Sequence, residues 1–211
     1  EISREHTIRR PRPGLVTIAG GKYTTYRVMA EDTVNALSDD LGDLAPSTSN
    51  EVPLIGAAEP AEVFAESRLH PGSRQIDDEH LLRLSHRYGR LTVELLDAVE
   101  QNPELAAEMP GGAGTLAVEI VHAATHEGAL HVDDVLTRRT RLYLEAGDRG
   151  LVAARHAARL IGEVLGWDDQ TRSDEVARYQ RRVAAELEAQ MAPDDPSAAQ
   201  IRERVQDIRL N

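Results

Sequence analysis

The sequence predicts a mainly α-helical protein in which a short β-containing segment precedes one compact helical domain. Three observations lead to this prediction. From residue 60 to residue 192, apolar residues recur at three- and four-residue steps, the period of a helix with one buried face. Residues 1–40 instead contain two short runs rich in β-branched side chains. Hydrophobic residues make up 41% of the chain but aromatic residues only 3%, so we expect an aliphatic core.

The first forty residues are predicted to form a strand, a turn, a second strand and a helix. Residues 1–9 and 15–19 have strand composition, and RPRPG at 10–14 has the prolines and glycine of a turn. We expect strand 15–19 to be buried, because it is apolar and β-branched. Helical spacing after two glycines predicts a helix over 25–37. Since so small a unit cannot cover both faces of a sheet, we expect the chain to begin inside another domain.

The rest of the chain divides into a linker, an all-α domain and a tail. Residues 41–59 mix proline, glycine, serine and acidic residues without a period, which indicates a linker. Residues 60–192 form the predicted helical domain, and 193–211 a tail with some helical spacing. Asp133 or Asp134 is predicted to cap its third helix. The expected helical faces are Leu81–Val99, Val118–Thr125, Val135–Leu142, 151–165 ended by Gly166, and Val176–Leu187.

Composition excludes several classes of protein. The net charge of −12 and the pI near 5.1 argue against nucleic-acid binding, which needs a concentrated basic surface. No apolar run approaches the ~20 residues of a membrane-spanning helix, and residues 1–12 are too charged for a signal peptide. The absence of cysteine removes disulfides, thiolate catalysis and zinc–sulfur sites. We therefore expect a cytoplasmic protein.

The turn GGKYTT at residues 20–25 has the composition of an anion-binding turn. Glycines let a ligand approach the backbone, and the following helix start presents free N–H groups and partial positive charge. Lys22 is the only lysine among 24 Lys and Arg residues, which favours a role that needs a compact ammonium. A phosphate or the N1–C2=O edge of a reduced flavin would suit this turn. An ordinary tight turn explains the glycines about as well, and neither a P-loop nor G-x-G-x-x-G occurs.

An ordered series of motifs extends the signal beyond this turn. SREHTI at 3–8 precedes LVTIAGGKYTTYRVMAEDTV at 15–34, and PLIGA, RYG, VDDVLTRRTRL and LGW follow at 53–57, 87–89, 132–142 and 165–167. Together they resemble the C-terminal part of FAD-dependent glycerol-3-phosphate dehydrogenases, the membrane-associated, quinone-reducing enzymes of aerobic glycerol metabolism. The resemblance preserves order over about residues 3–188.

The resemblance implies that residues 1–40 are the remnant of an FAD-binding α/β domain and that the helical domain is the enzyme's cap. The whole enzyme would oxidise glycerol 3-phosphate to dihydroxyacetone phosphate and pass electrons through FAD to quinone. Arg4 would bind the substrate phosphate, and Lys22 would lie near both substrate and flavin. The expected cofactor-binding residues are Gly20, Gly21, Lys22, Tyr23, Thr24 and Thr25.

The same resemblance places the general base and the dinucleotide fingerprint upstream of residue 1, in an N-terminal FAD domain. We therefore expect the chain to be a C-terminal fragment that is inactive alone and contains no certain catalytic residue. The full-length protein would be cytoplasmic or peripheral on the inner face of the membrane. Oligomeric state stays open, with a homodimer as one alternative. A non-catalytic helical interaction or dimerisation module is the rival interpretation.

Two polar clusters have a structural interpretation that we prefer. Glu119, His122 and His126 fall near one helical face and could hold zinc, but no fourth ligand follows and alanine-rich helices often display such residues to solvent. We expect no metal site. Arg138 lies four residues after Asp134 and three before Arg141, which indicates an ion-paired helix face at a domain or subunit contact rather than an anion site.

Overall fold

The computed structural model describes residues 5–112 and 114–205, which divide into two compact units, Glu1–Ile55 and Gly56–Asn211. The first unit contains a β-hairpin and short helices, and the second is helical. The predicted fold class, mainly α with a preceding strand–hairpin–strand–helix segment, is confirmed. The boundary between the units falls within the segment predicted to be a linker.

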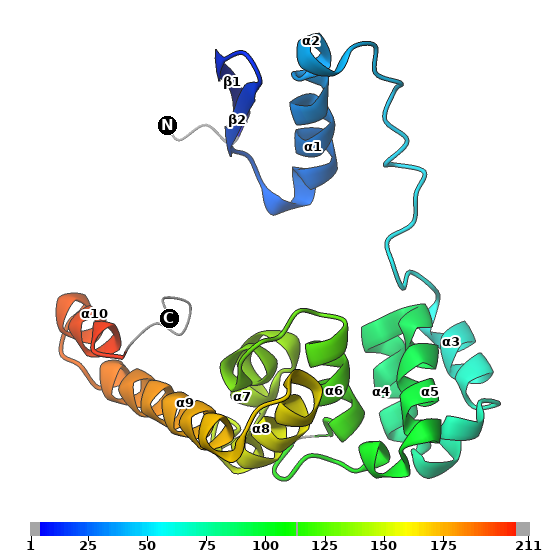
Figure 1. The fold of residues 1–211 in the computed structure, drawn as a ribbon, viewed down its shortest axis with the longest axis vertical. Helices are drawn as coiled ribbons and strands as arrows, with labels where there is room; N and C mark the ends of the chain where they lie inside the picture. Colours follow the sequence, from blue (N-terminus) through cyan, green and yellow to red (C-terminus); the bar gives the residue numbers. More distant parts are fainter. Residues whose placement is uncertain (1–4, 113, 206–211) are drawn as a thin grey trace. The chain divides into compact units, whose positions relative to one another are not determined.

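The first unit is an antiparallel hairpin followed by a helix (Figure 1). Strand β1, His6–Arg12, pairs with β2, Leu15–Gly20, so that Ile8 lies opposite Ile18. The first strand extends through most of the predicted turn, and the pairing register shifts between Arg9 and Arg12, where Pro11 cannot donate a ladder hydrogen bond. After β2, a 3-10 turn at Tyr23–Thr25 leads into α1, Tyr26–Asn35, and α2, Ser38–Leu41.

The expectation that strand 15–19 is buried is wrong. Leu15 and Ile18 are each 37% exposed, and no described residue from 5 to 55 is buried. Within residues 5–55, α1 packs on the hairpin but leaves its apolar side chains partly exposed. Polar contacts hold hairpin and helices together: His6 Nε2 lies 2.8 Å from Asp32 Oδ2, and Arg10 donates to Asp39 and Asp40.

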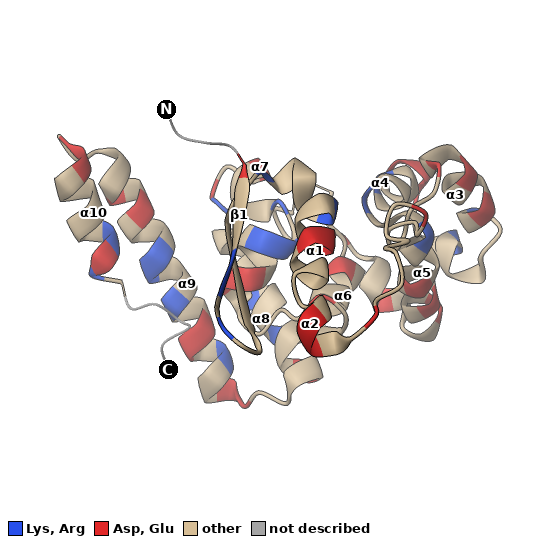
Figure 2. Ribbon diagram, turned by 90° about the horizontal axis from the view of Figure 1, so that it is seen from above, with Lys and Arg blue, Asp and Glu red and all other residues tan. Residues whose placement is uncertain are grey.

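The second unit is built from helices that pack in two groups (Figure 1). Helix α3 packs on α4 and α5, while α8 packs on α6 and α9. Both charge signs are interspersed along α9 (Figure 2). The helices are α3 Pro60–Ser67, α4 Asp78–Tyr88, α5 Thr92–Gln101, α6 Ala117–Thr125, α7 Leu142–Glu145, α8 Leu151–Leu165, α9 Asp169–Gln190 and α10 Asp195–Glu203. Shorter turns lie at Pro71–Gln75, Gly89–Leu91 and Pro103–Ala106 (3-10) and at Asp134–Arg139 (π).

Local sequence signals set several helix ends. The side chains of Asp77, Asp168 and Asp194 accept hydrogen bonds from backbone N–H groups in the first turns of α4, α9 and α10. Helix α8 spans the predicted residues 151–165 and ends at Gly166, whose φ of 71° is left-handed. The tail is helical as far as Glu203, and Ile208 lies outside the described residues.

The third predicted helix is wrong in detail. The structure instead has the π-helical turn, a break at Thr140, and the single turn of α7. Neither aspartate supplies the predicted cap. Asp133 forms ion pairs with Arg138 and Arg182, and Asp134 accepts from the backbone N–H of Leu130 at 3.1 Å.

The core of the second unit is aliphatic, as expected. Its fully buried side chains come from all the helices between α4 and α9, and Tyr88 and Tyr179 are the aromatic residues of the core cluster. Leu84, Leu96, Ile120, Leu136 and Ile161 are each 0% exposed. Burial of side chains of this size contributes about 1.5–3 kcal/mol each, which accounts for a stable unit without a large aromatic content.

Two motif glycines distant in sequence meet in this unit. Gly56 of PLIGA lies against Gly89 of RYG, and the Arg90 N–H donates to the Gly56 carbonyl at 3.0 Å. A Cβ at Gly89 would come within 1.8 Å of the Gly56 oxygen, and Gly89 has φ 52°. Only glycine permits this approach, so the two motifs serve one contact that joins the segment before α3 to the end of α4.

No helix in the described part of the chain combines the length and apolarity needed to cross a membrane.

Candidate functional site

The Gly-Gly-Lys turn lies at the end of β2 and has the backbone that its sequence predicts. Gly20 and Gly21 have φ of 84° and 86°, a region that disfavours other residues. A Cβ on Gly21 would lie 2.5 Å from the Met29 sulfur, and one on Gly20 would lie 2.8 Å from the Glu5 carbonyl oxygen. The positive φ angles favour glycine at both positions, and the Glu5 backbone leaves no room for a Cβ at Gly20, independently of any ligand.

Lys22 presents its ammonium group to solvent. The residue is exposed, its backbone is extended, and no ion pair joins its side chain to any residue from 5–112 or 114–205. Thr25 folds the turn back, because its backbone N–H and its hydroxyl both donate to the Lys22 carbonyl at 3.0 Å. The N–H groups of Tyr23 and Thr24 begin the helical segment and have no acceptor within it. The turn thus combines one unpaired cation with backbone donors.

Five of the six residues predicted to contact the cofactor are exposed, and Gly21 is half-buried. Tyr23 is 92% exposed, with its ring 6.2 Å from that of Tyr26. Arg4, the predicted phosphate-binding residue, lies outside the described residues.

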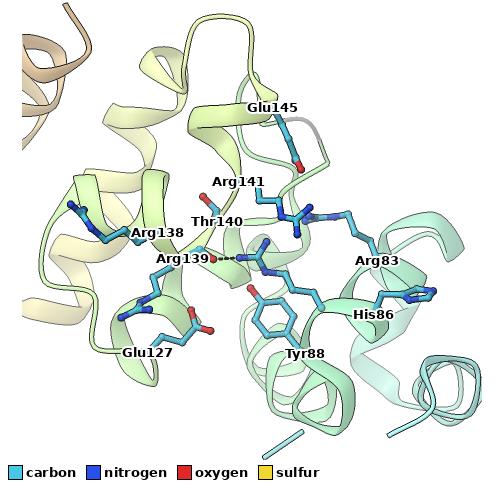
Figure 3. A pocket seen from close by; sticks show the side chains of 10 residues that line it. Arg83, His86, Tyr88, Glu127, Arg138, Arg139, Thr140, Arg141 and Glu145 are labelled. Atoms are coloured by element: carbon cyan, nitrogen blue, oxygen red, sulfur yellow. Dashed lines mark hydrogen bonds between the residues drawn. The ribbon is translucent and has the colours of Figure 1, made fainter. Parts of the chain in front are cut away.

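A second polar site lies within the helical unit, where a pocket of about 590 Å³ is lined mainly by arginine (Figure 3). Its side chains come from α4, from the chain after α6, and from the π-helical turn and α7. Pockets of this volume bind small ligands in other proteins. The lining residues are Arg83, His86, Arg87, Tyr88, Glu127, Arg138, Arg139, Thr140, Arg141 and Glu145.

Buried Glu119 organises one wall of this pocket. Its carboxylate is 0% exposed and accepts hydrogen bonds from Arg83, from the Tyr88 hydroxyl at 3.1 Å and from the Leu116 N–H at 2.9 Å. Arg87 Nε lies 3.6 Å from the same carboxylate. Burial, and then the Glu119 charge, raise the pKa of the Tyr88 hydroxyl far above its usual value, so it remains a donor. Glu119 therefore fixes two arginines and a tyrosine.

The predicted ion-paired face is present in part. Arg138 pairs with Asp133 and, at 3.3 Å, with Asp134. Arg141, expected to share that face, has no ion pair among the described residues, and neither does Arg139, whose carbonyl accepts from Arg87. Chemically, these two guanidinium groups are the ones on the pocket wall that remain available to an oxyanion.

The three residues considered for zinc do not assemble as the sequence suggested, because Glu119 faces the arginine pocket. His122 and His126 do stack, with ring centroids 4.7 Å apart. Glu94 of α5 takes the place of Glu119: its donor atom and those of the two histidines all lie within 4.8 Å of one another. Burial, followed by the nearby His126, lowers the pKa of His122, which favours the neutral imidazole. Sequence spacing contains no signal for Glu94, because it arrives from another helix.

Comparisons with known proteins identify relatives along the whole chain. The family model for the C-terminal domain of alpha-glycerophosphate oxidase matches residues 47–172. Glycerol-3-phosphate dehydrogenase 2 of Mycobacterium tuberculosis is 40% identical over 99% of this chain, and the Mycobacterium leprae glycerol-3-phosphate dehydrogenase is also 40% identical over 99%. A mitochondrial glycerol-3-phosphate dehydrogenase of Arabidopsis thaliana is 29% identical over 84%. The chain spans 36%, 36% and 30% of these relatives' lengths. The resemblance read from the motifs is confirmed.

Proposed function

This chain belongs to the family of the C-terminal domain of alpha-glycerophosphate oxidase, and on that premise we propose that it is the C-terminal part of an FAD-dependent glycerol-3-phosphate dehydrogenase. The names of the relatives support the substrate. Because the chain spans about a third of their length, the activity belongs to a protein of that length. That protein would oxidise the C2 hydroxyl of sn-glycerol 3-phosphate to dihydroxyacetone phosphate, with quinone as the final acceptor.

The observation that carries the proposal is the Gly20–Thr25 turn, whose lysine has no ion pair among residues 5–112 and 114–205. FAD, when bound, supplies the hydride acceptor. The residues fit such a group: Lys22 offers a cation with no acidic partner among the described residues, and Tyr23 and Thr24 offer backbone donors at a helix start. Positive charge and oriented N–H groups stabilise negative charge that develops as the reaction proceeds. Lys22 thus orients and stabilises, while the proton of the substrate hydroxyl is removed by a base elsewhere in the full-length protein.

Substituting Lys22 in the full-length protein tests this role. We expect Lys22→Met to lower kcat/KM about tenfold or more, since charge-assisted hydrogen bonds contribute roughly 1.5–3 kcal/mol. Lys22→Arg is the matched control: it keeps the charge but replaces the compact ammonium with a planar fork, so we expect partial activity. Unchanged kinetics in a Met variant with normal FAD content would remove Lys22 from the site.

Arg4 gives a second test, based on its place in the motif SREHTI. If its guanidinium binds the substrate phosphate, Arg4→Ala should weaken glycerol 3-phosphate far more than glycerol, because glycerol lacks the phosphate. Steady-state kinetics with both substrates measure the difference. Equal losses for the two substrates would show that Arg4 has a structural role.

The chain by itself is expected to be colourless and inactive, because the turn forms only one wall of a flavin site. Incubation of the 211-residue chain with excess FAD, followed by desalting and an absorbance spectrum, tests this expectation. Flavin retained in equal stoichiometry would mean that the chain holds a complete cofactor site, and the proposed division of the enzyme would be wrong.

A further inference from the structure

We propose that Glu94, His122 and His126 form a Zn²⁺ site that connects the end of α6 to the start of α5. Their donor atoms all lie within 4.8 Å of one another, and His126 Nε2 is 4.0 Å from Glu94 Oε2. Two imidazoles and a carboxylate are a common protein ligand set for zinc, with water in the fourth position. The helices that carry these residues, α5 and α6, pack against each other.

The distances require only small adjustments. Zinc bonds to nitrogen and oxygen of about 2.0–2.2 Å place tetrahedral ligand atoms roughly 3.4 Å apart. His122 and His126 are four residues apart and their rings stack with 14° between planes, so one ring must turn for both nitrogens to point to the ion. The side chains of Glu94 and His126 are 47% and 57% exposed, so solvent rather than packed side chains surrounds much of each. Rotation of these two side chains closes the gap.

Thr125 selects the nitrogen of His126 that would bind the ion. Its hydroxyl donates to the Val121 carbonyl at 2.9 Å, a common contact for threonine inside a helix. The hydroxyl has one proton, so its 2.7 Å contact with His126 Nδ1 is one in which the ring N–H donates. This arrangement leaves the lone pair on Nε2, the atom that faces Glu94. Hydrogen bonds of this kind orient metal-binding histidines generally.

His122 also has a ring nitrogen that can coordinate a metal ion. Its side chain is 5% exposed and packs edge-on against the Tyr88 ring, with centroids 5.4 Å apart. Neither ring nitrogen has a hydrogen-bond partner among residues 5–112 and 114–205. The lone pair of the neutral ring is therefore available to a metal ion.

A second cluster, His70 with Asp97 and Glu100, shows the contrast. His70 Nδ1 accepts from the Gly72 N–H at 3.1 Å, so its proton is on Nε2, which lies 3.1 Å from Asp97 Oδ1. Both nitrogens of His70 are therefore occupied. This cluster is a hydrogen-bonded cap of the turn at Pro71–Gln75, and it provides a matched control.

Metal titration of the untagged 211-residue chain tests the site. We expect one Zn²⁺ per chain by calorimetry, and Co²⁺ should give the visible absorption of a tetrahedral complex. Excess Zn²⁺, at about 100 times Kd, should raise Tm by roughly 5–10 °C. His126→Gln and Glu94→Gln should each weaken binding tenfold or more, whereas His70→Gln should not. The absence of stoichiometric binding would overturn the proposal, as would binding that survives both ligand variants or is lost in His70→Gln.

The role of Thr125 has its own test. Thr125→Val preserves the shape of the side chain but removes the hydroxyl, so affinity should fall about 10–100-fold with the Co²⁺ spectrum retained. Thr125→Ser should restore the affinity. If the Val variant binds as tightly as the unmodified chain, Thr125 does not select the nitrogen and the geometry we assign to His126 is wrong.

Discussion

The two units of this chain show that a recognisable sequence motif and a stable core can be separate properties. The first unit carries the Gly-Gly-Lys turn, yet none of its described residues is buried. The second unit has less conspicuous motifs but a continuous aliphatic core from Ile76 to Val183. The difference teaches that backbone geometry and polar contacts determine the conformation of residues 5–55, whereas burial of apolar side chains determines that of the helical unit.

The helical unit also contains the buried polar network that the first unit lacks. Glu119 is enclosed and satisfied by Arg83, Tyr88 and a backbone N–H. In the first unit, the comparable contact between Arg10 and Asp39 involves an aspartate whose side chain is 83% exposed. An exposed pair contributes about 0–1 kcal/mol, while breaking a buried one is far more costly.

The largest expected effect is therefore at Glu119. Replacing it with alanine leaves Arg83 and Tyr88 without this acceptor and Arg87 without its ion-pair partner, so we expect Glu119→Ala to lower the free energy of unfolding by about 3–5 kcal/mol. Glu31→Ala, at an exposed position of α1, is the control and should change it by about 0.5 kcal/mol or less. Urea unfolding followed by circular dichroism measures both. Similar losses of unfolding free energy for the two variants would contradict the view that buried polar contacts stabilise only the second unit.

The next largest effect should come from shortening an apolar side chain in each unit and comparing the loss of stability. Leu84 is 0% exposed, and Leu84→Ala should cost about 2–5 kcal/mol through lost burial and the cavity left behind. Ile18 is 37% exposed, so Ile18→Ala should cost under about 1 kcal/mol. The same urea experiment applies. A large loss at Ile18 would show that the hairpin is part of a cooperative core.

These comparisons also show which features could be predicted from sequence. Helix α8 and its terminating Gly166 were predictable, because both the apolar period and the left-handed cap are local. The exposure of strand 15–19 was not predictable, since apolar composition indicates that a strand can be covered but not whether a covering layer is present. The approach of Gly56 to Gly89 was also invisible until the fold placed the two motifs together.

The candidate sites divide in the same way. The Gly20–Thr25 turn is contiguous, so its composition and its positive φ angles could be read from a few residues. The roles of Glu119 and Glu94 depend on which helix each side chain faces. Helical spacing placed Glu119 beside His122, but its buried carboxylate pairs with Arg83 and Arg87 of α4 instead. The direction of the Glu119 side chain therefore depends on ion pairs with another helix, which helical periodicity does not indicate.

Lowering the pH should reveal a smaller difference in stability between the two units, caused by the aspartates that cap helices of the second unit. Hydrogen bonds from Thr171 lower the pKa of Asp168 below its ordinary value of 3.8. A carboxyl whose pKa is lower in the folded state stabilises fully above pH 3.8, and its contribution is lost as pH falls through the folded pKa. Hydrogen bonds from His80 and Ser197 likewise lower the pKa values of Asp77 and Asp194. By contrast, α1 has no side-chain hydrogen bond at its N-cap.

Asp168→Asn isolates this effect, because asparagine also caps helices but does not titrate. Its Tm should match that of the unmodified chain at neutral pH and fall less steeply as the pH drops below about 4. Thermal melts at a series of pH values measure the difference. Parallel curves would mean that Asp168 does not contribute to the acid transition.

The smallest effect should come from the largest deletion, removal of residues 1–55. Every residue of the core cluster lies between Ile76 and Val183, and a chain that begins at Gly56 keeps the hydrogen bond from Arg90 to the Gly56 carbonyl. We therefore expect its Tm to change by less than about 2 °C, below the shift produced by 1 kcal/mol in a unit of this size. The separate peptide 1–55 should show no cooperative melting, because a two-stranded hairpin with one helix buries too little apolar surface to offset chain entropy. A truncated chain whose Tm falls by more than about 4 °C would show that the first unit stabilises the second. The motif-bearing residues would then be part of the structural unit rather than an addition to it.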